Sequence, residues 1–369
     1  MRIAMLAPRA SVRGPLPKLT TLLIDALRHL GCTVELLPWG RRVEGERLLA
    51  KLLGRARDVA FAVRAVVHGG FPVVVVHTAH DWLTLTRDLA LLRMLPRSSV
   101  VVLQFHGSQS PRLVAPGSRA FKGATAALLA RADGILVLSH EERAEWEAFR
   151  PGVQVSVVRN PRPKVPESTV VEGRPADGQK SILCVARLIP GKGAVELVRA
   201  LPLVQEMVSC RLVLAGDGPE EARLRALVAD LGVSDSVQMA GHVDGAELAG
   251  LYRSADVFAL PTTLPEGFPT VILEAMEAGL PIVTTRSRGP ADHLVEGRHA
   301  LFVPPRDPVA LAASLTCLLS DRESLRLMGE ANREKAREFD ADPVAAEYLA
   351  AIEQIVRSAG KRDLGAGRS

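Results

Sequence analysis

Two glutamates flank a short turn within residues 265–281, and their spacing could do chemistry. Glu266 precedes a Gly-Phe-Pro turn, and Glu274 lies about two turns into the helical run that follows. Both carboxylates are predicted to reach one cleft from the N-terminal end of that helix. A carboxylate accepts hydrogen bonds from vicinal hydroxyls, while the free amides of residues 268–271 and the helix dipole attract an anion. A ligand that carries both a sugar and a diphosphate matches these groups.

The elements around this turn are predicted to place it at a ligand-binding edge. Pro269 suits the first helical turn, where its missing N–H costs nothing. Strand-like runs at residues 256–261 and 281–285 bracket the helix, which indicates a strand, helix, strand unit. Loops at the carboxyl ends of such strands bind ligands in open α/β sheets. The alternative is a helix capped near one acid, with the second acid on its solvated face.

Two cations are expected at another strand end. The predicted strand at residues 181–186 ends in Arg187, turns through Pro190 and Gly191, and presents Lys192 before a helix. Cations there suit an anionic ligand, and they can neutralise the charge that builds up on a departing diphosphate. The alternative is a surface arginine and a lysine at the end of a helix.

Together these residues resemble the signature of a known enzyme family. Glu266 and Glu274 are similar to the E-x7-E motif of retaining glycosyltransferases with the GT-B fold, in particular family 4, the glycosyl transferases group 1. Residues 185–193 resemble the family's "GRL…KG" motif. The resemblance implies that Glu266 contacts the transferred sugar, that Glu274 holds the nucleotide ribose, and that Arg187 and Lys192 clamp the donor phosphates. It spans most of the chain and is weaker in the first half.

The resemblance implies an activity and its partners. A hexosyl unit would pass from a UDP- or GDP-sugar to an acceptor hydroxyl with retention, in cell-envelope glycan or glycolipid synthesis. The expected partners are the nucleotide-sugar donor and a glycan or lipid-linked acceptor, with no cofactor or metal. A front-face mechanism, in which the leaving phosphate helps accept the acceptor proton, follows from the same resemblance. Two alternatives are a GT-B epimerase of sugar nucleotides and a non-catalytic homologue that only binds them.

Further site residues come from the same resemblance. His106 at a strand end resembles the family histidine near the transferred sugar, although it could instead be bonded to backbone. Gly14 replaces the paired glycines of the family, and Pro15 removes an amide there, so donor contacts from this loop are open. The predicted catalytic residues are His106, Glu266, Arg187 and Lys192, and the predicted donor-binding residues are Glu274, Gly267, Phe268, Pro269, Thr270, Gly14, Gly216 and Gly241.

Two competing motifs are rejected. The string that contains Gly216 and Gly218 follows a predicted strand as a dinucleotide fingerprint does, but Glu221 occupies the third glycine position. His77 and His80 could suggest a metal. Their spacing at a strand end does not place both imidazoles on one helical face, and the sequence offers no third ligand nearby.

Length and composition predict two domains in a cytoplasmic protein. A chain of 369 residues with 47% apolar residues is long enough for two cores and is not disordered. The apolar run at the N-terminus is too short for a signal peptide, and no apolar run is long enough to span a membrane. The widely spaced cysteines are expected to be small core residues in a reducing compartment, namely Cys32, Cys184, Cys210 and Cys317.

Alternating strands and helices predict an α/β fold with a parallel sheet in each half. The expected strands cover residues 2–6, 33–37, 73–77, 100–105, 134–138, 153–158, 181–186, 211–215, 237–240, 257–260, 282–285 and 300–303. The linker composition predicts a boundary near residue 165. The resemblance implies two GT-B domains, Rossmann-like and facing across a deep cleft: an acceptor-binding domain at residues 1–165 and a nucleotide-sugar-binding domain at residues 166–344. Residues 345–369 would form a helix followed by a mobile tail, and the resemblance implies that this helix crosses back to the first domain.

Charge is divided unevenly between the halves. Residues 1–165 hold 24 Lys+Arg against 12 Asp+Glu, although the chain as a whole is only +5. Within residues 41–67, arginines alternate with apolar residues at helical spacing, and such a helix can lie on the anionic inner face of a membrane. The alternative is a core-facing helix with a solvated basic rim. Nucleic acid is not expected, because only 4% of residues are aromatic and no binding module is present.

Overall fold

The computed structural model describes the whole chain except residues 10–11, 13, 41–47, 116, 163–177 and 367–369. The chain divides into two compact units. The first unit comprises Met1–Pro161 and Phe339–Ser369, and the second comprises Arg162–Glu338. The predicted boundary at residues 165 and 166, most of the predicted linker, and the start of the basic helix at residues 41–47 lie outside the described residues.

The first unit is built on a six-stranded parallel sheet with the order β2-β1-β3-β4-β5-β6. The central strands β3 and β4 are rich in valine, as is typical of parallel strands that are covered on both faces. The strands are β1 (Arg2–Ala7), β2 (Thr33–Pro38), β3 (Val73–Thr78), β4 (Val100–Phe105), β5 (Gly134–Val137) and β6 (Val155–Val157). The helices are α1 (Pro15–His29), α2 (Leu48–Gly69), α3 (Trp82–Met94), α4 (Pro111–Val114), α5 (Arg119–Leu129), α6 (His140–Phe149) and α14 (Ala341–Ala366).

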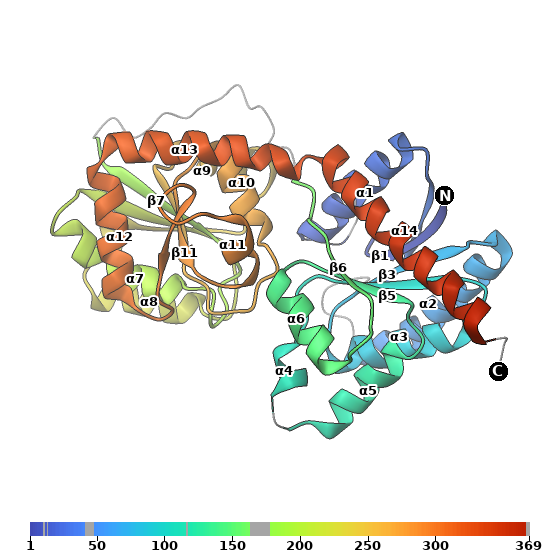
Figure 1. Cartoon of the computed structure of the whole chain (residues 1–369). Helices are drawn as coiled ribbons and strands as arrows, with labels where there is room; N and C mark the ends of the chain where they lie inside the picture. Colours follow the sequence, from blue (N-terminus) through green and yellow to red (C-terminus); the bar gives the residue numbers. More distant parts are fainter. Residues whose placement is uncertain (10–11, 13, 41–47, 116, 163–177, 367–369) are drawn as a thin grey trace. The chain divides into compact units, whose positions relative to one another are not determined.

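Alternate strand residues feed two separate cores in the first unit. Ala4 and Leu6 pack with apolar residues of α2, α3, α4, α5 and α6, whereas Ile3 and Met5 pack with α1 and α14. The two helical layers lie on opposite faces of the sheet in Figure 1. The C-terminal helix α14 therefore contributes directly to a core of the first unit, as predicted.

Specific contacts fix α14 in that place. The hydroxyl of Tyr348 donates to Oε1 of Gln104 on β4 at 2.5 Å. A Cβ on Gly134 would lie 2.7 Å from the side chain of Ile355, so the helix approaches β5 closely. Helix α14 also packs along α1.

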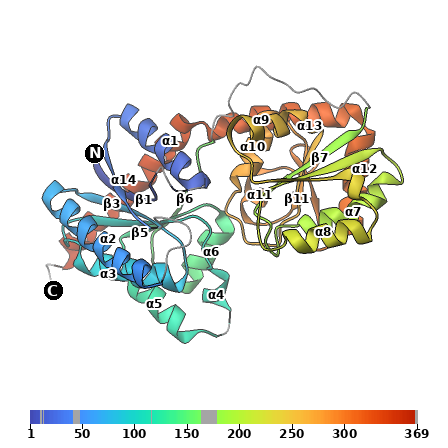
Figure 2. The same ribbon diagram turned by 180° about the vertical axis from the view of Figure 1, so that it is seen from behind.

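The second unit has a six-stranded parallel sheet with the order β12-β11-β10-β7-β8-β9. Helices α7, α8 and α12 cover one face, and α9, α10 and α13 cover the other (Figure 2). The strands are β7 (Lys180–Val185), β8 (Cys210–Ala215), β9 (Val237–Gly241), β10 (Val257–Leu260), β11 (Ile282–Thr285) and β12 (Ala300–Val303). The helices are α7 (Ala194–Gln205), α8 (Glu221–Asp230), α9 (Gly245–Ser254), α10 (Thr270–Ala278), α11 (Arg288–His293), α12 (Pro308–Ser320) and α13 (Arg322–Ala336), with 3-10 turns at Ser234–Ser236 and Arg337–Phe339.

Two sequence-based expectations need correction. Cys317 is exposed on α12, whereas Cys32, Cys184 and Cys210 are buried as predicted. Pro269 is the residue before α10 and has extended backbone angles, so it does not lie within the first helical turn. In the part of the chain that the structure describes, no helix is both long and apolar enough to cross a bilayer.

Candidate active site

Three loops at the carboxyl edge of the second sheet pack together through glycines. Residues 186–193 follow β7, and residues 216–220 follow β8. A Cβ on Gly216 would lie 1.9 Å from the carbonyl oxygen of Ala186, and one on Gly218 would lie 2.3 Å from a carbonyl oxygen of the same loop. Both glycines have positive φ, which other residues rarely adopt. A side chain at either position would force the two loops apart.

The third loop, residues 261–269 between β10 and α10, lies against the first. The N–H of Thr263 donates to the carbonyl oxygen of Gly191 at 2.7 Å. A Cβ on Gly193 would lie 2.6 Å from the carbonyl oxygen of Pro261. Strands β7 and β10 are neighbours, and the strand order reverses between them. Ligands of open α/β sheets bind at this kind of reversal.

Lys192 and Glu266 form an ion pair where these loops meet. The Nζ of Lys192 donates to Oε1 of Glu266, and the two side chains are 15% and 21% exposed. An ammonium has three protons and a carboxylate has two oxygens, so each group keeps hydrogen-bonding capacity for a ligand. Sequence reasoning assigned the lysine to phosphate and the glutamate to sugar, and it did not foresee that each side chain would hold the other in place.

Arg187 lies in the same loop as Lys192 but is exposed. Its side chain makes no hydrogen bond or ion pair with any residue that the structure describes. Its guanidinium therefore keeps all its donors for an anion.

The N-terminal end of α10 is open to a ligand. Pro269 precedes the helix, and no side chain within the described ranges caps it. The N–H of Ile272 donates to the carbonyl oxygen of Pro269 at 3.0 Å, so the amides of Thr270 and Val271 are the first-turn donors left for a ligand. Phe268 is 5% exposed, and its ring lies 4.9 Å from that of His293. A Cβ on Gly289 would lie 1.5 Å from the carbonyl oxygen of Gly267. Helix α11 thus supports the turn that the sequence placed at the donor.

Glu274 is held by a tyrosine that sequence analysis did not identify. The hydroxyl of Tyr252 on α9 donates to Oε2 of Glu274 at 2.8 Å. Burial, followed by the charge of Glu274, raises the pKa of Tyr252 well above its usual value, so the phenol stays protonated. Glu274 is the fifth residue of α10, and its side chain points back toward the helix N-terminus.

Gly241 completes the edge next to the loop of Gly216. The N–H of Gly216 donates to the carbonyl oxygen of Gly241 at 2.6 Å, and Gly241 has a φ of 68°. The register of the two strands shifts between Leu214 and Ala215. His242, which follows, is exposed. Gly216 and Gly241 are therefore brought together, Gly216 one strand and Gly241 two strands away from β7, which precedes Lys192.

In the first unit, His106 follows β4 and pairs with a second histidine. The Nε2 of His106 is 2.8 Å from Nδ1 of His77 on β3, and the ring centroids are 5.0 Å apart. Burial lowers the pKa of His106 to about 4, and burial and then His106 lower the pKa of His77 well below 6.5. Both rings are neutral at pH 7, so one donates to the other. The Nδ1 of His106 has no hydrogen-bond partner among the described residues.

Gly14 is less informative. It precedes α1 with a φ of 123° and is exposed, and residues 10–11 and 13 of the same loop lie outside the described residues. Pro15 is the first residue of α1, where its missing N–H costs nothing.

Neither His77 nor His80 belongs to a metal-ligand group. His80 bonds through Nε2 to the hydroxyl of Thr125 at 3.0 Å, and its ring packs against Phe105, Phe121 and Trp146. Over the described ranges, no group of three or more potential metal ligands is present.

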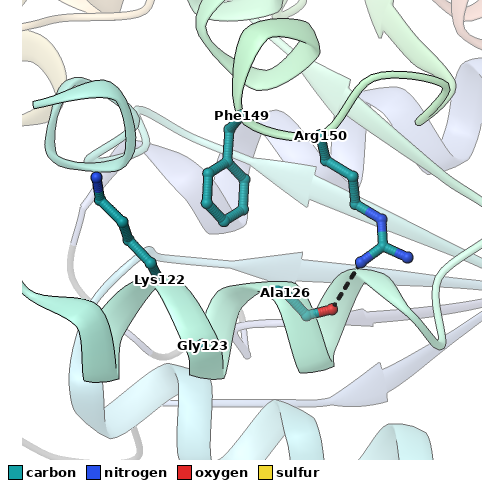
Figure 3. Close-up of a pocket in the computed structure, with 5 residues that line it drawn as sticks. All are labelled: Lys122, Gly123, Ala126, Phe149 and Arg150. Carbon is teal, nitrogen blue, oxygen red and sulfur yellow. Dashed lines mark hydrogen bonds between the residues drawn. The ribbon is translucent and has the colours of Figure 1, made fainter.

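A pocket of about 320 Å³ in the first unit involves none of the predicted site residues. It lies between α5 and α6 and is lined by Lys122, Gly123, Ala126, Phe149 and Arg150 (Figure 3). The donor-binding prediction, apart from Gly14, falls in the second unit, so this pocket is a separate feature of the fold.

Solved structures share the fold of the whole chain. HepE of Anabaena, in complex with UDP, matches with a TM-score of 0.75 at 19% identity and covers 96% of this chain and 100% of its own. Sucrose-phosphate synthase of Thermosynechococcus elongatus matches with a TM-score of 0.78 at 21% identity and covers 97% of this chain and 99% of its own. The predicted GT-B fold is confirmed.

Sequence comparisons identify the family. The family model for glycosyl transferases group 1 matches residues 168–335. A GDP-mannose-dependent alpha-(1-6)-phosphatidylinositol monomannoside mannosyltransferase of Mycobacterium tuberculosis is 37% identical over 161 residues, 42% of each chain. The match therefore spans less than half of that relative's length. Glycogen synthase of M. tuberculosis is 30% identical over 287 residues, which are 75% of this chain and 69% of that protein. The chain therefore belongs to the glycosyl transferases group 1, family 4 of the retaining glycosyltransferases.

Proposed function

We propose that this protein transfers a hexosyl unit from a nucleotide-sugar donor to an acceptor hydroxyl, with retention of anomeric configuration. The observation that carries the proposal is the convergence at one strand edge of Lys192, Glu266 and the uncapped start of α10. A sugar diphosphate needs a cation and free amides for its phosphates, and a carboxylate that accepts hydrogen bonds from its sugar hydroxyls. Family membership supports the same activity.

Each side chain then has a distinct task. Arg187, Lys192 and the α10 amides stabilise the diphosphate as the bond to the sugar breaks, so they act most strongly on the charge that develops in the transition state. Glu266 binds sugar hydroxyls, and its pairing with Lys192 sets sugar and phosphate at a fixed separation. Glu274 accepts hydrogen bonds from the ribose while Tyr252 orients it.

His106 is proposed to bond the transferred sugar near the reacting carbon. Its neutral ring suits a hydroxyl partner better than a phosphate, because an imidazolium would be needed to neutralise charge. The leaving phosphate helps accept the proton of the acceptor hydroxyl. The two cations take the place of a divalent ion, so turnover should persist in excess chelator. Restoration of activity by an added metal would contradict this part of the proposal.

The donor is proposed to be a UDP- or GDP-sugar and the acceptor a glycan or a lipid-linked sugar. HepE of Anabaena was solved with UDP, and the mannosyltransferase relative is GDP-mannose-dependent and acts on a phosphatidylinositol monomannoside. A thermal-shift panel of UDP-, GDP- and ADP-sugars identifies the base, and turnover with glycan and lipid-linked acceptors follows with the best donor.

Mass analysis of the products separates transfer from epimerisation. Free nucleoside diphosphate and an enlarged acceptor indicate transfer, whereas an isomer of the donor indicates an epimerase. A shift in melting temperature without either product would leave a non-catalytic binding protein. Glu274→Ala should raise the donor KM sharply in the first case, and an unchanged KM would exclude Glu274 from the donor site.

A further inference from the structure

Four helices of the first unit form a surface without exposed carboxylates. Helices α2, α3, α4 and α5 pack on one face of the sheet, opposite α1 and α14 (Figures 1 and 2). Residues 89–132 contain no Asp or Glu. In the preceding described helices, Asp58 is 6% exposed and Asp88 is fully buried, while Asp81 is half-buried and caps α3.

Cations and large apolar side chains share this surface. On α2, Arg57, Phe61, Arg64 and His68 follow one another at helical spacing and are all exposed. Phe61 is 54% exposed, although a phenylalanine is usually buried in a monomeric protein. The stripe is therefore basic and apolar at once.

Helix α3 continues the same pattern beside α2. Trp82 and Leu83 are 45% and 48% exposed at its start, and Met94 is 56% exposed at its end. Arg93 and Arg97 are exposed next to Met94. Helices α2 and α3 pack directly on each other, so the two stripes are adjacent.

Helices α4 and α5 extend the surface further. Val114 is 51% exposed, and Arg112 and Arg119 are exposed on either side of it. Helix α5 packs against α3, and three residues of α5 line the pocket of Figure 3. That pocket combines Lys122 and Arg150 with the ring of Phe149 and has no carboxylate in its lining.

The surface has clear limits. Beyond the pocket, α6 exposes Glu141 and Glu147, and on the opposite side of the sheet α14 exposes Asp342 and Glu353. Acids are therefore common elsewhere on the unit. The lack of exposed acids is therefore particular to the described residues of α2–α5 and does not extend to α6, which packs on the same face of the sheet.

We infer that this face docks on an anionic phospholipid bilayer. Its exposed residues are Arg57, Phe61, Arg64, Val67, Trp82, Leu83, Met94, Arg93, Arg97, Val114, Arg112 and Arg119. Arginines attract anionic headgroups, and a tryptophan, a phenylalanine and aliphatic side chains gain by entering the headgroup region. The pocket at its edge holds two cations, Lys122 and Arg150, each of which donates to one backbone carbonyl and keeps further donors for a lipid phosphate. A nucleic acid would gain little from aliphatic side chains, and a second copy would bring a second set of like charges.

Membrane docking is independent of the proposed transfer reaction, and its test does not need turnover. The full chain is floated with vesicles of phosphatidylglycerol and, separately, of phosphatidylcholine. Flotation is expected with phosphatidylglycerol alone and should fall as salt rises. Equal flotation with both lipids, or none with either, would overturn the inference.

Charge reversal on the face supplies the second arm. Arg57→Glu combined with Arg64→Glu should weaken partition by at least about 20-fold, because each basic residue near an anionic surface contributes about fivefold. The matched control is Arg322→Glu with Arg337→Glu, which makes the same change of net charge at two exposed arginines of the second unit. Equal losses in both double variants would show a net-charge effect and would refute docking through this face.

An apolar variant tests insertion. Phe61→Ser combined with Met94→Ser leaves the charge unchanged and should weaken partition by about tenfold, since both side chains are more than half exposed and support no core. The corresponding control is Leu327→Ser with Met207→Ser, two exposed apolar residues of the second unit. If the lipid-free protein sediments as a dimer and these variants dissociate it, the face binds a second copy instead.

Discussion

The two sheets have different strand orders, and in each sheet the candidate site residues lie beside the point at which the order reverses. In the second unit the order reverses between β7 and β10, and the loops after these strands carry Lys192 and Glu266. In the first unit it reverses between β1 and β3, with β4 next. The loop after β1 carries Gly14, while His77 on β3 meets His106 after β4. Both candidate sites thus sit at or beside a topological switch point.

The two switch points differ in how they are built. In the second unit, glycine contacts lock three loops and an ion pair sits among them, so charged groups are preorganised. In the first unit, two neutral imidazoles face each other, that of His77 buried and that of His106 half-buried. Under the proposed function, the second unit binds the anionic diphosphate and the first unit binds uncharged hydroxyls. Variants in each unit can test this difference in binding.

Lys192→Ala is expected to cause the largest loss. Removing a charge that stabilises a departing diphosphate should lower kcat/KM by about 100- to 1,000-fold, as for other groups that act on transition-state charge. It also leaves Glu266 without its partner. Steady-state kinetics with the best donor measures the effect.

Lys180→Ala is the control for this variant. Lys180 also pairs with a carboxylate, Asp256, but it lies at the start of β7, away from the three loops. It should leave kcat/KM within about twofold, as expected for a partly exposed ion pair. Similar losses in the two variants would show that the lysine acts on stability rather than on the donor.

Acid should destabilise the first unit through its histidines. His80 is 2% exposed, and burial lowers its pKa from 6.5 to about 4. The folded state therefore favours the neutral ring. The stabilisation is complete above pH 6.5 and is lost as pH falls toward 4, with a total of about 3 kcal/mol from this histidine. Chemical denaturation followed by tryptophan fluorescence measures this, because all three tryptophans lie in the first unit and Trp146 packs on His80.

His80→Phe should flatten that pH dependence because it keeps a ring and removes the titrating group. Its stability at pH 7 drops by about 1 kcal/mol with the lost bond to Thr125. His29→Gln changes an exposed histidine of the same unit and should keep the wild-type slope. A slope in His80→Phe equal to that of the wild type would mean that other groups control acid unfolding.

His77→Leu tests whether the histidine pair matters for catalysis. It removes the hydrogen bond that fixes the tautomer of His106, so kcat/KM should fall about five- to tenfold, the value of one hydrogen bond. Nitrogen-15 chemical shifts of His106 should change from one tautomer to a mixture. A lower kcat/KM with an unchanged His106 spectrum would point to packing alone.

Sequence periodicity could predict the elements, because both sheets are covered on both faces. Continuous β-branched runs such as the one in β3 identify buried parallel strands, and all twelve strands were predicted within a few residues. The motif also placed Lys192 and Glu266 in one site. Cys317 was misplaced because α12 is apolar almost all round, so its buried side could not be chosen from the pattern.

Partnerships between distant residues could not be predicted. Periodicity assigns a residue to a face but not to a neighbour on another element. His77 and His106 lie 29 positions apart, and Tyr252 and Glu274 lie 22 apart. The tyrosine's only sequence signal is a polar-tipped aromatic on the apolar side of α9, where a buried phenol needs a hydrogen-bond acceptor.

Tyr252→Phe is expected to have the smallest effect on activity, and together with Tyr348→Phe it compares the two units directly. Each unit has one buried tyrosine that donates to a side chain on another element: Tyr252 to Glu274, and Tyr348 to Gln104. Removing either hydroxyl should cost about 1 kcal/mol of stability. Only Tyr252→Phe should also raise the donor KM, by about fivefold, because Glu274 loses the bond that aims it at the ribose. Tyr348→Phe should keep the donor KM, since it joins α14 to β4 within the first unit. If both variants raise the donor KM equally, the two phenols act through the stability of the protein. Donor binding then depends on the first unit as well as on the packed loops of the second.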